Sequence, residues 1–352
     1  MSAVLARVPG KVVLSGEHAA VLGRPALAAA VGRHCTASVR ARPDARVGLL
    51  LPDVGVRRHT DWPSIRRYTA AARDRWTAHT AAARPGGFTA VRGDDPAHLV
   101  LAALGETLPH LPRPPGGLTL TVRSALPPGA GFGSSAAVAV ATAAALLAHA
   151  IGSADARTVA GAAGRAEELQ HGSPSGVDTA TVLRGGLLWL APDGRGAARA
   201  DPLTVAGDVQ DLFELHHTGP AAEPTGQVVA AVRGRLTPGL LDRAERATAG
   251  LREALTAPVP DRAGVIASVR ESARFLAALG VVPPSVAAIV RAVEAAGGAA
   301  KVCGAGSLRG PGAGALLVVR PPGEPVPIPG LSDTTRIGAP LGGPGLHWET
   351  TR

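Results

Sequence analysis

At 352 residues, the chain is long enough for roughly two domains around a sizeable core. Its net charge is +9, which raises the possibility of a nucleic acid partner. However, aromatic residues make up only 3% of the chain and the basic residues are scattered, so the composition argues against nucleic acid binding.

Cysteine usage and the start of the chain bear on its location. Cys35 and Cys303 are too few for a disulfide framework and lack the spacing of a zinc site, which fits a reducing cytoplasm. No apolar signal core precedes the first motif, and the longest apolar stretch, after Ser135, follows an entry typical of a buried helix. We therefore expect a cytoplasmic protein without a membrane partner.

The run over residues 6–28 contains Pro-Gly-Lys at residues 9–11, then a short strand predicted over residues 12–14 and a turn at Gly16-Glu17-His18. Arginine supplies 34 of the 36 basic residues, and Lys11 and Lys301 supply the other two. A compact ammonium can stand beside a reacting hydroxyl where a planar guanidinium cannot, so Lys11 is a candidate catalytic group. Glu17 and His18 either contact a substrate or brace the turn, and the residue types leave both open.

Alternating apolar positions predict strands over residues 36–40, 46–51 and 117–124. Residues 52–93 are polar and rich in arginine. Trp62, Tyr68 and Trp76 lie along this stretch, where they either cover an adenine ring or, as is more common, pack on the domain.

The central segment reads Leu-Pro-Pro-Gly-Ala-Gly-Phe-Gly-Ser-Ser-Ala-Ala over residues 126–137, before an alanine-rich helix predicted over residues 138–150. Its glycines allow a tight turn and a close approach to a ligand, and the unpaired amides of the following helix favour a phosphate group. No lysine follows the glycines, so this is not a Walker A loop, and its place in the chain does not suit a dinucleotide loop. The candidate phosphate-binding residues are Pro128, Gly129, Ala130, Gly131, Phe132, Gly133, Ser134 and Ser135.

A helix predicted over residues 154–170, with Ser153 as its cap, carries Glu167 and Glu168. The chain then reads His-Gly-Ser-Pro-Ser-Gly-Val-Asp over residues 171–178. By residue type alone, Asp178 is a turn carboxylate.

The second half of the chain begins with a strand predicted over residues 187–192 and a surface loop over 192–202. A Thr-Gly turn follows at Thr218, and helices are predicted over residues 239–256, 262–279 and 284–297. Residues 299–306 read as a strand that enters a glycine turn, and residues 314–320 as a second strand. The turn residues are Gly304, Ala305 and Gly306.

Taken together, these segments resemble the three motifs of the GHMP kinases. The central loop resembles their Pro-x-x-x-Gly-Leu-Gly-Ser-Ser, with Phe132 in place of leucine. The opening run and residues 171–178 are most similar to the mevalonate kinase branch, whereas galactokinases usually carry arginine at the Lys11 position. The third motif matches up to Gly306, after which an insertion over residues 307–311 intervenes, and Thr179 stands where asparagine is usual.

The resemblance covers nearly the whole chain and implies a two-domain α+β fold. It implies a ribosomal protein S5 domain 2-like, ATP-binding N-terminal domain over residues 1–195 and a ferredoxin-like C-terminal domain over residues 196–352, with the active site between them. ATP and Mg²⁺ are the implied cofactors and a small-molecule alcohol, above all mevalonate, the implied substrate. Phosphomevalonate, a sugar or another hydroxy acid stays open as the acceptor, as do a catalytically inactive nucleotide or sugar sensor and a homodimer.

The resemblance also assigns roles to residues. Asp178 matches the catalytic carboxylate, and Lys11 is placed near it. Ser135 and Glu167 match the magnesium ligands. The substrate-binding positions are Lys11, Glu17, His18, Asp178 and Thr218. Within the insertion, Arg309 is a candidate to reach the nucleotide or a second acidic group on the acceptor.

Overall fold

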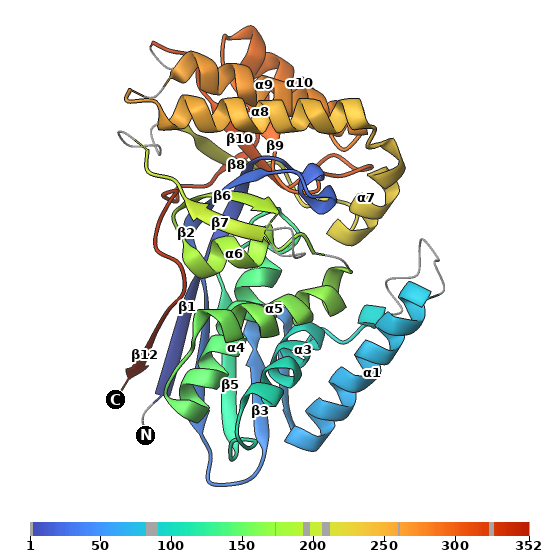
Figure 1. Cartoon of the computed structure of the whole chain (residues 1–352), viewed down its shortest axis with the longest axis vertical. Coiled ribbons are helices and arrows are strands. Elements are labelled where there is room, and N and C mark those ends of the chain that lie inside the picture. Colours follow the sequence, from blue (N-terminus) through green and yellow to red (C-terminus); the bar gives the residue numbers. More distant parts are fainter. Residues whose placement is uncertain are drawn as a thin grey trace.

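The computed structural model describes residues 3–81, 91–172, 174–192, 198–205, 212–259, 261–323 and 327–351. Within these residues the chain forms one sheet of eight strands and one of four. Figure 1 shows the larger sheet and its helices in the lower part of the molecule, the smaller sheet in the upper part, and both chain ends beside the larger sheet. This mixture of helices and mostly antiparallel strands confirms the predicted α+β class.

The larger sheet is built on two long neighbours, β1 (Ala3–Ser15) and β2 (Ala26–Ala41), which pair antiparallel over almost their whole length. Its order is β12-β1-β2-β5-β3-β4, and β6 pairs with both β2 and β7. The N-terminal half of β2 pairs with β6 and its C-terminal half with β5. The other strands of this sheet are β3 (Val47–Leu51), β4 (Val56–Thr60), β5 (Leu118–Ser124), β6 (Leu187–Pro192), β7 (Ala198–Pro202) and β12 (His347–Thr351).

An alanine-rich helix, α4 (Ser134–Ile151), packs against β1 and β2. Its small side chains let the helix lie close to the sheet, and α3 (His98–Thr107), α5 (Ala156–His171) and α6 (Val177–Arg184) pack around it, while α1 (Trp62–Ala81) packs against α3. Among the described helices, α4 is long and apolar enough to cross a membrane, but 67% of it is buried inside the protein. That burial is typical of a core helix.

The smaller sheet has the order β11-β8-β10-β9 and is antiparallel throughout. Its strands are β8 (Glu214–His217), β9 (Ala299–Val302), β10 (Ala315–Val319) and β11 (Thr335–Arg336). Three amphipathic helices lie over it in Figure 1: α8 (Pro238–Thr256), α9 (Arg262–Leu279) and α10 (Pro284–Ala295). A short helix, α7 (Thr225–Val232), precedes them.

The two parts share buried apolar residues. The largest hydrophobic cluster contains Ala130 from the central loop together with Cys303 and Ala315 from the smaller sheet. The last strand, β12, returns to pair with β1, and β7 also joins the larger sheet. The predicted division between residues 195 and 196 stays a prediction, and segments from beyond it contribute to the larger sheet.

Two local predictions were wrong and a third was too short. Asp155, not Ser153, caps α5, because its carboxylate accepts from the amides of Arg157 and Thr158. The loop predicted over residues 192–202 includes β7, while residues 193–197 lie outside the described residues. The strand predicted over residues 12–14 is the end of the 13-residue β1.

Candidate active site

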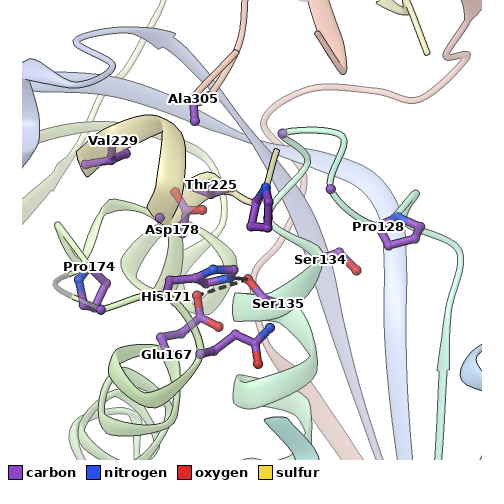
Figure 2. A pocket seen from close by; sticks show the side chains of 18 of the residues that line it. Pro128, Ser134, Ser135, Glu167, His171, Pro174, Asp178, Thr225, Val229 and Ala305 are labelled. Atoms are coloured by element: carbon purple, nitrogen blue, oxygen red, sulfur yellow. Dashed lines mark hydrogen bonds between the residues drawn. The ribbon is translucent and has the colours of Figure 1, made fainter. Parts of the chain in front are cut away.

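A cavity of about 1510 Å³ is lined by segments from both parts of the molecule. Its wall combines the end of β1, the central glycine loop, the turn between α5 and α6, helix α7 and the third glycine turn. Figure 2 shows side chains from several of these segments gathered around one space. The three sequence motifs, which are far apart in the chain, therefore meet at one site.

The glycine loop forms one wall of this cavity, and all eight predicted phosphate-binding residues line it. Gly129, Gly131 and Gly133 have φ values of +66°, +80° and +67°, which side-chain-bearing residues rarely adopt. A Cβ atom at Gly133 would lie 2.7 Å from Cγ of Lys11, and one at Gly131 would lie 2.5 Å from the carbonyl oxygen of Cys303. The glycines are therefore needed both for the turn and for close packing against the other two motifs.

Backbone hydrogen bonds hold the loop from both sides. The amide of Lys11 donates to the carbonyl of Phe132 (2.9 Å), and the amide of Ala315 donates to the carbonyl of Ala130 (2.7 Å). Gly133 is the N-cap of α4, and no side chain in the described part of the chain caps this helix. Its first amides lie at the cavity wall, where the positive end of the helix dipole favours an anion.

Lys11 and Asp178 form an ion pair beside this loop, with 3.0 Å between Lys11 Nζ and Asp178 Oδ1. The Lys11 side chain is 3% exposed, whereas Asp178, in the first turn of α6, is 40% exposed. The ammonium is therefore fixed inside the protein, while the carboxylate has an open side toward the cavity. A carboxylate in this position can accept a proton from a bound hydroxyl group.

Ser135, Glu167 and His171 form a second polar group, drawn with its hydrogen bonds in Figure 2. Ser135 Oγ donates a hydrogen bond to Glu167 Oε2 (3.1 Å). His171 Nε2 lies 3.1 Å from Ser135 Oγ, and because the serine proton is already used, the histidine nitrogen donates to the serine oxygen. Burial, followed by the negative charge of Asp178, raises the pKa of Glu167 to about 8, and burial lowers the pKa of His171 to about 4. A buried carboxyl of this kind ionises readily only beside a cation.

The turn after β1 is braced from the smaller sheet. Lys301, which is fully buried, donates to the Glu17 carboxylate and to the carbonyl of Val13 (3.1 Å). His18 has a φ of +58° and its Nε2 lies 3.0 Å from the carbonyl oxygen of Ala305. Glu17 and His18 therefore brace the turn, and both also line the cavity, so the two alternatives left open by the sequence are compatible.

Two predicted residues are absent from the described wall of the cavity. Thr218 Oγ1 donates to the carbonyl of Gly314 and accepts from the amide of Ala313, both at 3.0 Å, so its hydroxyl holds the segment before β10. Gly306 fits closely against the carbonyl oxygen of Val281, 2.3 Å from where a Cβ atom would lie. Gly304 and Ala305 do line the cavity.

The predicted reach of Arg309 is not observed. Its Nε donates to Glu223 (2.7 Å), and the other Glu223 oxygen accepts from Ser307 Oγ and from the amide of Leu308. Glu223 lines the cavity, but Arg309 does not belong to its described wall. The buried Glu223 carboxylate therefore holds the insertion over residues 307–311 against the loop before α7.

Sequence reasoning missed several residues of the site. Helix α7 contributes Thr225, Val229 and its C-cap residue Arg233. Of these, Thr225 was the one with a usable signal, because it follows the Thr218-Gly219 turn after five intervening residues. The cavity wall also includes apolar residues that carry no motif: Leu51, Val54, Trp76, Pro96, Leu99, Val100 and Val122.

The arrangement agrees with similarities to known proteins. The sequence model of the GHMP kinases N terminal domain matches residues 98–186, which include the glycine loop, Glu167 and Asp178. The chain is 29% identical to mevalonate kinase from Mus musculus over 361 residues, covering 90% of this chain and 86% of the mouse protein. It belongs to the GHMP kinase superfamily.

Two further similarities concern part of the sequence and the fold. The chain is 36% identical to mevalonate kinase from Bos taurus over 209 residues, and this match spans only 53% of the bovine protein and 53% of this chain. A crystal structure of mevalonate kinase superposes with a TM-score of 0.73 at 17% identity, covering 96% of this chain and 98% of that one. The GHMP kinase fold therefore extends over nearly the whole chain, and GHMP kinases take ATP as phosphate donor.

Proposed function

We propose that this protein transfers the γ-phosphoryl group of ATP to the primary hydroxyl of mevalonate. The observation that carries the proposal is the pair of a buried Lys11 and a half-exposed Asp178, 3.0 Å apart, in the same cavity as the glycine loop. Similarity to mevalonate kinases over 90% of the chain supports this choice of acceptor.

The glycine loop and the start of α4 bind the phosphate groups. Phosphoryl transfer leaves little covalent work to the protein, so catalysis consists of positioning and of stabilising charge on the transferred group. Backbone amides over residues 129–135 supply hydrogen bonds for this purpose without reorganisation, because both sheets hold the loop in place.

Ser135 and Glu167 would hold Mg²⁺. Glu167 Oε1 is buried and has no hydrogen-bond partner in the described part of the chain, and carboxylate and hydroxyl oxygens are donors that a hard divalent cation prefers. When bound, Mg²⁺ offsets negative charge on the phosphate groups. His171 keeps the Ser135 hydroxyl in place through its Nε2 proton.

Asp178 and Lys11 act on the acceptor. The acceptor hydroxyl donates its hydrogen bond to the open side of the Asp178 carboxylate, and the nearby ammonium lowers the pKa of that hydroxyl. As the bond between the hydroxyl oxygen and the γ-phosphorus forms, the bond to the bridging β,γ oxygen breaks and ADP leaves. The hydroxyl proton passes to Asp178, and Lys11 stabilises charge on the γ-phosphoryl group.

A coupled ADP-release assay across four acceptors tests the proposal. With MgATP, we expect mevalonate to be used at least about tenfold more efficiently, in kcat/KM, than phosphomevalonate, galactose or homoserine. A reaction without acceptor is the control, because ADP release that survives there comes from a contaminating ATPase.

Two results would overturn the choice of acceptor. If phosphomevalonate is preferred and Arg309→Ala removes that preference, the insertion binds an acceptor phosphate after all. If none of the four acceptors turns over, the enzyme belongs to another pathway.

A further inference from the structure

The charges along the cavity wall raise the question of what binds the carboxylate of an acidic acceptor. The described wall contains three arginine or lysine residues, Lys11, Arg92 and Arg233. A small anion bound away from bulk water needs a cationic or amide-rich partner. The question is therefore which of these three cations is available at the acceptor end.

Lys11 and Arg92 are both poor candidates. Lys11 is paired with Asp178 and lies where the reacting hydroxyl, not the distant carboxylate, would be. Arg92 follows Val91, whose carbonyl oxygen accepts a hydrogen bond from Arg75 Nε on α1 (3.2 Å), so Arg92 lies on the α1 side of the cavity.

Arg233 is the C-cap residue of α7. Gly226, Val229, Ala230 and Arg233 all line the cavity, and their spacing of three and four residues places them on one face of α7. Figure 2 shows Val229 and Thr225 on this helix, close to the part of the cavity that holds Asp178. Gly226 and Ala230 are small, so an apolar part of an acceptor can approach the helix closely at these positions.

The dimensions of α7 match a short hydroxy acid. Eight helical positions separate Thr225 from Arg233, a rise of about 12 Å. Side chains on a helix lean toward its N-terminus, so an extended arginine covers roughly half of that distance back toward Thr225. A five-carbon chain between a hydroxyl and a carboxylate spans roughly 6 Å with bonds of about 1.5 Å.

The guanidinium of Arg233 is also free. It is exposed and has no hydrogen bond or ion pair with any other described residue. Glu223, which lines the cavity from the loop before α7, accepts hydrogen bonds from Ser307, Leu308 and Arg309. Glu223 therefore neither neutralises Arg233 nor leaves an unpaired negative charge to repel an anion.

We infer that Arg233 is the acceptor-specificity residue of this enzyme and pairs with the carboxylate of the bound hydroxy acid. This inference rests on the proposed function, since it assumes an acidic acceptor phosphorylated at its far end. Asp178 and Arg233 then mark the two ends of the acceptor site, one for the hydroxyl and one for the acid.

The test compares mevalonate with its neutral amide, in which a carboxamide replaces the carboxylate. We expect Arg233→Met to lower kcat/KM for mevalonate by about 10- to 100-fold, mainly through KM, because a hydrogen-bonded charge pair is lost. The amide should change by less than about threefold, so the preference for the acid collapses. Arg233→Lys should recover part of the preference because it keeps the charge.

Arg246→Met is the matched control. Arg246 is an exposed arginine on α8 and does not belong to the described wall of the cavity, so its loss changes the net charge equally but should leave the preference intact. Turnover of the amide by each variant reports whether the protein is folded.

The outcomes separate the two proposals. If wild-type protein does not phosphorylate mevalonate, the proposed function fails, and the role of Arg233 fails with it. If wild-type protein does so but Arg233→Met leaves the ratio of acid to amide unchanged, or lowers both substrates equally, the role of Arg233 alone is refuted.

Discussion

Replacing Asp178 with asparagine is the most direct test of the chemistry. The amide keeps the size of the side chain but cannot take a proton, so we expect kcat to fall by about 100-fold or more. MgATP affinity should stay within about twofold, because the loop amides and the Ser135 and Glu167 side chains are unchanged. Steady-state kinetics and calorimetric titration with MgATP measure the two quantities separately.

The same substitution should lower stability by a modest amount. Lys11 is 3% exposed and would lose its counter-charge, which costs about 3–5 kcal/mol when both partners are buried. Asp178 is 40% exposed, so solvent screens the pair and we expect about 1–2 kcal/mol, or a Tm lower by roughly 1–3 °C for a chain of this length. Adding Lys11→Met removes the unpaired charge, so the double variant should regain stability but not activity.

Two results would refute this reasoning. A folded Asp178→Asn protein with nearly normal kcat would remove Asp178 from the chemistry. Strictly additive losses of stability in the double variant would mean that the ion pair is not coupled, despite its 3.0 Å separation.

Two further substitutions test the neighbouring groups. Lys11→Arg should be nearly as damaging to kcat/KM as Lys11→Met, because a planar guanidinium cannot take the place of a compact ammonium beside Asp178; activity near wild type would show that charge alone suffices. Glu167→Gln should raise the Mg²⁺ concentration needed for half-maximal rate, and an unchanged Mg²⁺ dependence would place the metal elsewhere, with Glu168 the next candidate.

The parts of the fold that could be predicted from the sequence have local causes. The bounds of α9 follow from Asp261, whose carboxylate caps its start, and from Gly280, which ends it in the left-handed region. The central loop follows from three glycines before an alanine-rich helix, and all eight predicted residues do line the cavity. Such signals lie within a few residues of the structure that they specify.

Other elements carry no readable period. The first six residues of β2, Ala26–Val31, are all buried, so their apolar residues do not alternate with polar ones. Helix α3 is buried on nearly all sides, which removes the 3.6-residue pattern expected of an amphipathic helix. In both cases it is burial by other parts of the chain that erases the pattern.

The contacts between side chains within the site could not be predicted from the sequence either. Lys301 and Glu17 are 284 positions apart, and nothing local indicates that they form an ion pair. Thr218 was a reasonable substrate-binding candidate by motif, but its hydroxyl is used by Gly314 and Ala313. A motif identifies the segment that belongs at a site, whereas the direction of each side chain depends on tertiary contacts.

The contact between the glycine loop and the smaller sheet leads to a prediction about a residue outside the described wall of the cavity. Gly314 has a φ of +76°, and a Cβ atom there would lie 2.8–3.0 Å from three backbone atoms of Ala130. Gly314→Ala should therefore displace the loop and weaken the hydrogen bond from the Ala315 amide to Ala130. We expect the KM for ATP to rise about tenfold, the equivalent of about 1.4 kcal/mol, with little change in the KM for the acceptor.

Gly342→Ala separates this effect from backbone strain. Gly342 has the same φ of +76°, but nothing lies within 4 Å of where its Cβ atom would be. Both variants therefore carry a left-handed cost of about 1–2 kcal/mol in stability, and only Gly314→Ala should affect ATP. If the two variants raise the KM for ATP equally, the smaller sheet does not position the phosphate loop. If Gly314→Ala acts alone, nucleotide binding by the larger sheet depends on a backbone contact supplied by the smaller one.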